Sequence, residues 1–116
     1  MSILGIDIGT TGTKAIVFSD EGKILTSAYL EYAQIFPKLG WVEFDVNQMW
    51  GKIFNVIRMV NSDDLVKKDP VTSLSVSTVG ESFTPIDKKG NTLYNTIYSK
   101  TKRFLFTEDL LFHIIM

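Results

Sequence analysis

The sequence contains no cysteine among its 116 residues, and this absence excludes disulfide scaffolds and zinc sites built on cysteine. The sequence also lacks an excess of positive or negative charge. The formal net charge is -1, which gives no electrostatic reason to expect nucleic acid or a membrane surface as a partner. No basic segment followed by an apolar run opens the chain, and no apolar run reaches the ~18 residues of a membrane span. We therefore expect a soluble protein of the cytoplasm.

Histidine is nearly absent as well, because His113 is the only one. No other metal-binding side chains surround it in the sequence, and we interpret it as structural or exposed. Hydrophobic residues make up 45% of the chain. This content suffices for one small core, but 116 residues are too few for two full domains.

The most informative stretch begins at Ile3 and is apolar up to Ile8, except for Asp7. A turn rich in glycine and threonine follows, and an apolar run resumes after Lys14. This pattern predicts a hairpin with strands at 3–8 and 14–19. Glycine lets the main chain approach a ligand closely, and successive N–H groups in such a turn form a concavity that binds anions. A Walker phosphate loop is excluded, because a helix would have to follow the lysine.

Asp7 is an acid inside an otherwise apolar strand, which costs free energy unless the carboxylate is paired or used. Beside a phosphate cradle, a carboxylate is useful when Mg²⁺ bridges it to the phosphates. We therefore predict Asp7 as a metal ligand. The predicted cofactor-binding residues are Gly9, Thr10, Thr11, Thr13 and Lys14. The alternative is a hairpin that needs glycine only for its geometry, with Asp7 capping the turn.

Periodicity predicts the remaining elements. A polar turn at 20–23 leads to a third strand at 24–33, and an aromatic connection covers 34–46. Asp45 then stands as the N-cap of an amphipathic helix, with Gln48 in the capping-box position. The apolar face that this helix is expected to bury comprises Val46, Met49, Trp50, Ile53, Phe54, Ile57 and Val60.

Asn61 to Asp64 read as the loop that ends the helix, and 65–70 as a mostly charged, exposed segment. The alternating, β-branched run at 71–79 predicts a fourth strand, parallel to the first because it follows a helix. Short extended segments at 83–87 and 92–98 flank a turn at 88–91. The order of elements indicates an α/β fold with three antiparallel strands, a helix and a parallel fourth strand. Because ligands bind beyond the carboxyl ends of parallel strands, we expect Glu81 on the same rim as Asp7.

The motif Asp7-Ile8-Gly9-Thr10-Thr11-Gly12-Thr13-Lys14 resembles the first phosphate motif of the actin/hexokinase superfamily, and most of all that of the FGGY carbohydrate kinases. Leu39 to Asp45 resemble the Gly-Trp-x-Glu-x-Asp segment before the first helix of that family, and Ser77 to Phe83 resemble a branch with Gly-Glu. The resemblance implies a ribonuclease-H-like fold, with residues 1–99 as the N-terminal part of the first kinase domain. It also implies ATP and Mg²⁺ as cofactors, and phosphorylation of a sugar or polyol hydroxyl.

By this resemblance, Trp41, Gly80 and Glu81 contact the substrate. The alternatives are that Trp41 only packs down its loop and that Glu81 is a surface residue in a turn. The resemblance ends at Lys100, which stands where the family carries the aspartate that takes the proton of the sugar hydroxyl. A lysine is normally protonated at neutral pH and cannot accept that proton. We therefore assign no catalytic residue.

Residues 100–116 match nothing in the family pattern and form a divergent tail, with a short helix predicted from Thr107. We expect a truncated and inactive portion of a kinase. The rival hypothesis is a non-catalytic ribonuclease-H-like interaction module, which forms a homo-oligomer or binds a partner protein through an uncovered sheet edge or the apolar tail. A nuclease of this fold is disfavoured, because beside Asp7 and Glu81 no acids complete a two-metal site.

Overall fold

The computed structural model describes residues 1–80 and 82–98, which divide into two compact units. The first unit holds Met1–Ala33 and Asn47–Val79, and the second holds Gln34–Val46 and the described residues from Gly80 onward. The predictions for Glu81, Lys100, His113 and the tail lie outside the described residues. None of the described helices combines the length and the apolar character needed to cross a membrane.

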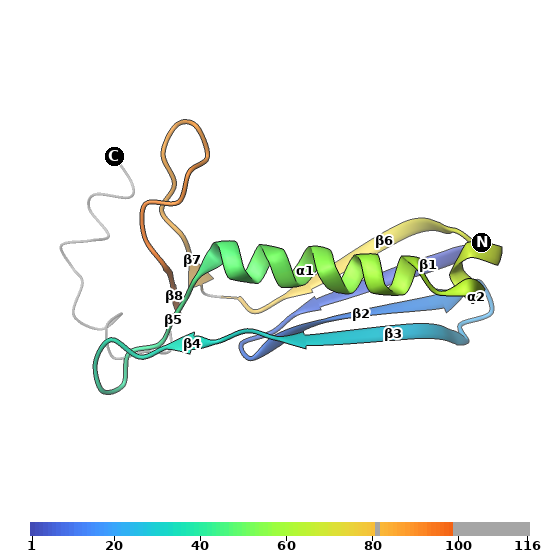
Figure 1. Ribbon diagram of the computed structural model, residues 1–116, viewed down its shortest axis with the longest axis horizontal. Coiled ribbons are helices and arrows are strands. Elements are labelled where there is room, and N and C mark those ends of the chain that lie inside the picture. Colours follow the sequence, from blue (N-terminus) through green and yellow to red (C-terminus); the bar gives the residue numbers. More distant parts are fainter. Residues whose placement is uncertain (81, 99–116) are drawn as a thin grey trace. The chain divides into compact units, whose positions relative to one another are not determined.

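A four-stranded sheet forms the first unit, and its strand order is β3-β2-β1-β6 (Figure 1). The strands are β1 (Ser2–Ile8), β2 (Gly12–Ser19), β3 (Ile24–Glu31) and β6 (Val71–Thr78). β2 pairs antiparallel with both β1 and β3, whereas β6 pairs parallel with β1. Helix α1 (Val46–Asn61) and the short helix α2 (Asp64–Lys68) lie between β3 and β6 in the sequence. The predicted arrangement of three antiparallel strands, a helix and a parallel fourth strand is confirmed.

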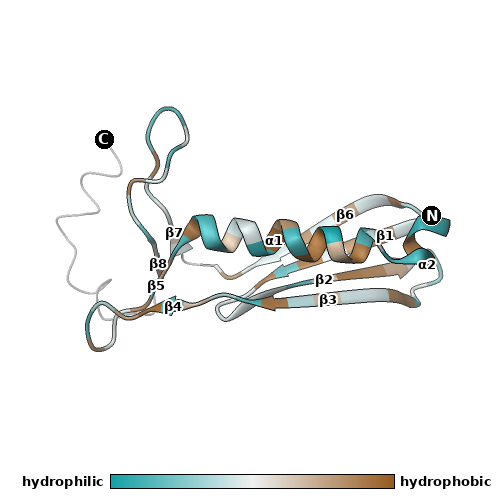
Figure 2. Ribbon diagram, viewed as in Figure 1, coloured by the Kyte–Doolittle hydropathy of each residue, from teal (hydrophilic) through white to brown (hydrophobic). Residues whose placement is uncertain are grey.

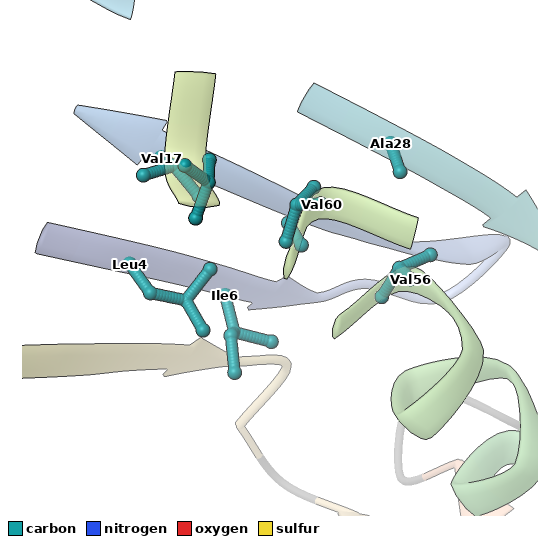
Figure 3. Close-up of a cluster of buried hydrophobic side chains, with 8 residues drawn as sticks. Leu4, Ile6, Val17, Ala28, Val56 and Val60 are labelled. Carbon is teal, nitrogen blue, oxygen red and sulfur yellow. The ribbon is translucent and has the colours of Figure 1, made fainter. Parts of the chain in front are cut away.

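One face of this sheet packs against α1 and carries the core. Alternate residues of β1 and β2 point to this face, because successive side chains of a strand point to opposite sides. Figure 3 shows Leu4, Ile6 and Val17 beside Val56 and Val60 of the helix, all of them buried. Full burial of such a side chain contributes about 1.5–3 kcal/mol. Figure 2 shows the corresponding hydrophobic positions recurring along α1 between hydrophilic ones.

The predicted buried face of α1 is wrong at Trp50 and Phe54, which are 52% and 54% exposed. The buried stripe is Met49, Ile53, Val56 and Val60. At about 100° per residue, Trp50 and Phe54 lie on the flank of this stripe rather than within it. Their rings stack on each other, with centroids 5.8 Å apart. Apolar character alone does not separate the centre of a helical stripe from its flank.

The segment at 65–70 is mostly exposed, as predicted, but it also contains most of helix α2, which the sequence did not predict. Asp63 is its N-cap, and its Oδ1 accepts a hydrogen bond of 2.9 Å from the N–H of Leu65. Val66 of this helix is buried in the core. The sequence did not predict this contact, because charged residues surround Val66 and a short apolar stretch gives no periodic pattern.

The second unit is a small antiparallel sheet of order β4-β5-β8-β7. Its strands are β4 (Gln34–Ile35), β5 (Glu43–Phe44), β7 (Ser82–Phe83) and β8 (Thr96–Tyr98). The sequence predicted no strand at 34–46, and strands of two residues carry too little pattern to be recognised. Glu43 is buried here, and its carboxylate accepts hydrogen bonds from Tyr94 Oη at 3.2 Å and Asn95 Nδ2 at 3.0 Å. The predicted turn at 88–91 is present, closed by Gly90 N–H donating to the carbonyl of Asp87.

Candidate phosphate-binding site

The turn between β1 and β2 is closed by its own backbone. Gly9 N–H donates to the carbonyl of Gly12 at 2.9 Å, so only Thr10 and Thr11 lie between the two glycines of this bond. A Cβ at position 9 would lie 3.3 Å from the Gly12 carbonyl oxygen, and one at position 12 would lie 2.7 Å from the Leu30 carbonyl oxygen. Gly12 is therefore required by close approach of the main chain, whereas a Cβ at Gly9 would need the Gly12 carbonyl to shift by a few tenths of an ångström.

Two tyrosines associated with β3 hold this turn in place. The Tyr32 hydroxyl donates a hydrogen bond to the Gly9 carbonyl, and Tyr32 N–H donates to the Thr11 carbonyl at 3.2 Å. The Tyr29 hydroxyl lies 3.5 Å from Thr11 Oγ1 and packs directly over Gly12. We refer to Tyr29 and Tyr32 as the tyrosine brace. Because these contacts fix carbonyl groups of the turn, they also orient the adjacent N–H groups.

The Tyr32 phenol remains a hydrogen-bond donor at neutral pH. Burial, together with the nearby Tyr29 and Asp7, raises the pKa of this group to about 12. Sequence reasoning missed both tyrosines. Their signal is the register of the second hairpin, which sets Lys14 opposite Tyr29. That register has a shift between Val17 and Phe18, so counting residues outward from the turn at 20–23 does not recover it.

Asp7 and Lys14 face each other across β1 and β2 as a register pair. Both line an open cavity of about 230 Å³ on the sheet face that α1 does not cover. Ser75 and Ser77 of the parallel strand β6 complete its polar lining. The structure thus brings one carboxylate, one ammonium group and two hydroxyls to one cavity. Of the predicted phosphate-site residues, Asp7 and Lys14 line this cavity, whereas Gly9, Thr10, Thr11 and Thr13 do not.

Asp7 fits the role of a single magnesium ligand. Within residues 1–80 and 82–98, no three His, Asp or Glu side chains gather as a metal-binding group. Mg²⁺ typically takes one or two protein carboxylates and fills its remaining positions with water and substrate phosphates. An exposed carboxylate at an open cavity suits such a site, whereas a cation that needs an all-protein cage does not fit it.

Thr13 differs from the other predicted phosphate residues. Its side chain is fully buried, and Thr13 Oγ1 donates a hydrogen bond to the Asp7 carbonyl at 3.1 Å. This hydroxyl therefore stabilises the hairpin next to the turn, through its hydrogen bond to the main chain. Thr10 is half-buried and Thr11 is exposed, and both lie at the tip of the turn.

The predicted substrate residues belong to the other unit. Trp41 is half-buried, and Lys38 Nζ lies 4.9 Å from the centroid of its ring, a cation–π contact. Gly80 is exposed, with open space around the position of an added Cβ. Both residues are assigned to the second unit, whereas Asp7 and the turn belong to the first. The role of these residues in substrate binding therefore stays a prediction.

The strand order, together with a hairpin that carries Asp7 before its glycine turn, defines a ribonuclease-H-like fold of the kind found in sugar kinases. The chain contains part of such a domain. The chain belongs to the FGGY family of carbohydrate kinases, whose N-terminal domain it matches over residues 2–111.

Its relatives include the glycerol kinase of Bacillus velezensis, which is 38% identical over 102 residues, 87% of this chain and 21% of that protein. The glycerol kinase of Thermus thermophilus is 36% identical over the same shares of the two chains. The chain therefore spans about a fifth of the length of these curated relatives.

Solved structures agree in fold. A xylulose kinase from Rhodospirillum rubrum matches with a TM-score of 0.84 and 23% identity, covering 98% of this chain and 23% of that one. Plasmodium falciparum glycerol kinase with ADP matches with a TM-score of 0.71 and 27% identity, covering 97% of this chain and 22% of that one.

Proposed function

We propose that the hairpin from Asp7 to Lys14 binds the phosphates of ATP together with Mg²⁺, as part of a kinase that phosphorylates a small sugar or polyol. The observation that carries this proposal is the cavity lined by Asp7 and Lys14, which precede and follow the braced glycine turn in the sequence. Asp7 would provide one oxygen ligand to the cation. Bound Mg²⁺ would neutralise the phosphate charge that develops during transfer.

The other residues of the hairpin have separate roles in this proposal. The Lys14 ammonium group attracts a phosphate oxygen as a point charge. Thr10 and Thr11 offer the polar groups of the turn, and Gly9 allows a phosphate to approach the main chain. The Thr13 hydroxyl contacts no ligand in this proposal. It stabilises the site by donating a hydrogen bond to the Asp7 carbonyl.

For the acceptor, we propose Trp41, Gly80 and Glu81 as the contacts. A carboxylate accepts hydrogen bonds from the hydroxyls of a polyol, and an indole ring packs against its carbon chain. Glycerol is the first acceptor to test, because glycerol kinases from Bacillus velezensis and Thermus thermophilus are among the relatives. We place the activity in the cytoplasm, where ATP and Mg²⁺ are available.

We also propose that these 116 residues do not catalyse transfer by themselves. Lys100 occupies the place of the proton-accepting aspartate in the family pattern, and a protonated lysine cannot act as that base. Phosphoryl transfer further depends on groups that position both reactants and stabilise charge on all sides of the phosphate. The chain spans only about a fifth of its relatives.

The test is an NMR titration of the full ¹⁵N-labelled chain with Mg·ATP, which detects weak binding without requiring turnover. We expect the largest amide shifts at 9–14, and we expect them to shrink when EDTA removes the cation. Asp7→Asn should abolish this dependence on Mg²⁺. The control is Asp20→Asn, which removes an exposed acid from the turn between β2 and β3.

Shifts that are spread over the chain, or equal with and without Mg²⁺, would contradict the assignment of the site. The lack of activity is tested separately by sugar-dependent release of ADP with glycerol, pentoses and hexoses. We expect no sugar-dependent release of ADP. Release at ordinary kinase rates would refute the proposed lack of activity, but it would leave the assignment of the phosphate site standing.

A further inference from the structure

Glu43 is the only charged residue among the buried residues that the structure describes. It is 1% exposed, although burial of a carboxylate costs free energy unless hydrogen bonds or an opposite charge compensate for it. A well-packed apolar side chain of similar volume would avoid that cost. The acid at this position therefore calls for a role that an apolar side chain could not fill.

The carboxylate of Glu43 joins two segments that are far apart in the sequence. Its Oε1 accepts a hydrogen bond from the Tyr94 hydroxyl at 3.2 Å, and its Oε2 accepts one from Asn95 Nδ2 at 3.0 Å. These partners lie 51 and 52 residues further along the chain, directly before β8. We refer to these two hydrogen bonds as the Glu43 tie. The tie connects β5 to the segment that leads into β8.

The strand pairing of the small sheet places this tie beside its central strand pair. Glu43 lies opposite Ile97 of β8, and Phe83 of β7 lies opposite Ile97 from the other side (Figure 1). Tyr98 N–H donates to the Val42 carbonyl at 3.2 Å, which joins β8 to the residue before β5. The tie therefore acts on the alignment of β5 with β8, and through β8 on β7.

The apolar contacts of this sheet set the alignment less narrowly. Ile97 is buried, and Phe44 packs edge to face on Tyr98 with ring centroids 6.3 Å apart. Apolar burial is not directional, and strands of two or three residues have few backbone hydrogen bonds to prevent a slip in register. Hydrogen bonds to an ionised acceptor are directional and about twice as strong as neutral ones, so the tie selects one register.

Each of these three strands is next to a residue that matters for the proposed acceptor. Trp41 lies two residues before β5, Glu81 directly precedes β7, and Lys100 lies two residues after the end of β8. Lys100 stands at the position of the proton-accepting aspartate in the family pattern. Binding residues keep their geometry when neighbouring hydrogen bonds fix the elements that carry them.

We propose that Glu43 is a positioning residue for the acceptor: its carboxylate aligns the three strands that lead to the acceptor contacts, without touching the acceptor itself. At 1% exposure the carboxylate is not available to a polyol. The link to the acceptor rests on the proposed function, whereas the alignment of β5 with β8 rests only on the two hydrogen bonds.

The test exchanges donor and acceptor in the Asn95 hydrogen bond while the size of both side chains stays nearly the same. Asn95→Asp alone sets a second carboxylate against that of Glu43, which should open the tie. Adding Glu43→Gln restores the hydrogen bond in the reverse direction, because the new amide nitrogen replaces Oε2 and donates to the new carboxylate. The new amide oxygen still accepts from Tyr94, and the pair keeps its single negative charge.

Hydrogen exchange in the full ¹⁵N-labelled chain measures how often the tie opens, with the Tyr98 amide as the probe because it donates to the Val42 carbonyl. Asn95→Asp should raise the exchange rate of this amide by roughly tenfold or more. The double variant with Glu43→Gln should return the rate to within about threefold of the wild type.

The two tryptophans show whether the effect is local, because Trp41 belongs to the second unit and Trp50 to the first. The indole N–H signal of Trp41 should shift in Asn95→Asp and return in the double variant. The indole signal of Trp50 should not change. The matched controls are Glu21→Gln and Asn55→Asp, which make the same chemical changes at exposed positions of the first unit and should leave Trp41 unaffected.

An unchanged exchange rate at Tyr98 in Asn95→Asp overturns the proposal, and so does a double variant that exchanges as fast as the single one. Equal shifts of both indole signals would show a change of the whole chain and would overturn the positioning role of Glu43. Failure of the proposed function is seen separately, as missing Mg·ATP shifts at 9–14 in the wild type, which lie in the first unit.

Discussion

Replacing Gly12 with alanine tests whether the tyrosine brace packs against the turn from Gly9 to Gly12. A Cβ at this position would lie 2.5 Å from the Tyr29 hydroxyl oxygen, 2.6 Å from Tyr29 Cζ and 2.7 Å from the Leu30 carbonyl oxygen. All three distances are below the separation that carbon and oxygen atoms tolerate. The ring of Tyr29 can swing away, but the Leu30 carbonyl belongs to the main chain of β3, where residue Leu30 is the register partner of Thr13.

The expected cost follows from these contacts. Adding one methyl group to a tightly packed site destabilises by about 1–3 kcal/mol. The upper part of this range applies here, because one of the three clashes involves backbone. Tyr29→Ala removes two of the clashes but not the third, so the Gly12→Ala/Tyr29→Ala double variant should recover only part of the loss.

Urea unfolding followed by circular dichroism measures this cost as a shift of the midpoint at constant slope. The control is Gly51→Ala in α1, where an added Cβ meets nothing within 4 Å. Alanine in place of glycine within a helix stabilises by about 0.5–1 kcal/mol, so the control should shift the midpoint in the opposite direction. If Gly12→Ala is as stable as the wild type, or if both variants shift the midpoint alike, the turn is not braced as described.

Three further predictions concern the same unit. Tyr32→Phe should lower the free energy of unfolding by about 1 kcal/mol at neutral pH, measured by urea titration, because the Gly9 carbonyl loses its hydrogen bond. The pKa of Tyr32 is raised from 10.0 to about 12 in the folded state, so wild-type stability should fall as pH rises from about 10 to about 12, where only the unfolded phenol ionises. The stability of Tyr32→Phe should not show the part of this decline that comes from Tyr32. If wild type and Tyr32→Phe lose stability equally between about pH 10 and about pH 12, the raised pKa of Tyr32 is refuted. The hydrogen bond from Leu65 N–H lowers the pKa of Asp63, so its contribution should be present above the ordinary value of 3.8 and lost as pH falls through the lowered value. Acid unfolding of Asp63→Asn, which keeps the cap without titrating, should begin at lower pH than that of the wild type.

The first hairpin and the parallel fourth strand could be predicted from sequence because their signals are local. An apolar run broken by Gly-Thr-Thr-Gly specifies a turn, and a β-branched run after a helix specifies a parallel strand. Asp7 stood out for a local reason as well, since it is the one acid in its strand. These signals do not depend on how distant segments meet.

The tyrosine brace and helix α2 could not be predicted, because each depends on a distant contact. Tyr32 reaches Gly9 across 23 residues of sequence, and the register shift in the second hairpin decides which side chain arrives there. Val66 becomes a core residue only because α2 packs beside β3. The exposure of Trp50 has a similar origin, since the direction in which α1 meets the sheet selects which flank is covered.

The geometry of the candidate site also depends on both local sequence and contacts between distant segments. A two-stranded hairpin is marginally stable alone, so the short turn at Gly9 cannot hold its carbonyls and N–H groups in one geometry without support. The third strand supplies that support through Tyr29 and Tyr32, and β6 supplies Ser75 and Ser77 to the cavity of Asp7 and Lys14. Residues that touch no ligand therefore set the geometry of the proposed phosphate site. In the Mg·ATP titration, Tyr32→Phe should weaken binding while leaving its dependence on Mg²⁺ intact, whereas Asp7→Asn should remove that dependence. If Tyr32→Phe also removes the dependence, then Asp7 is not the residue that holds the cation.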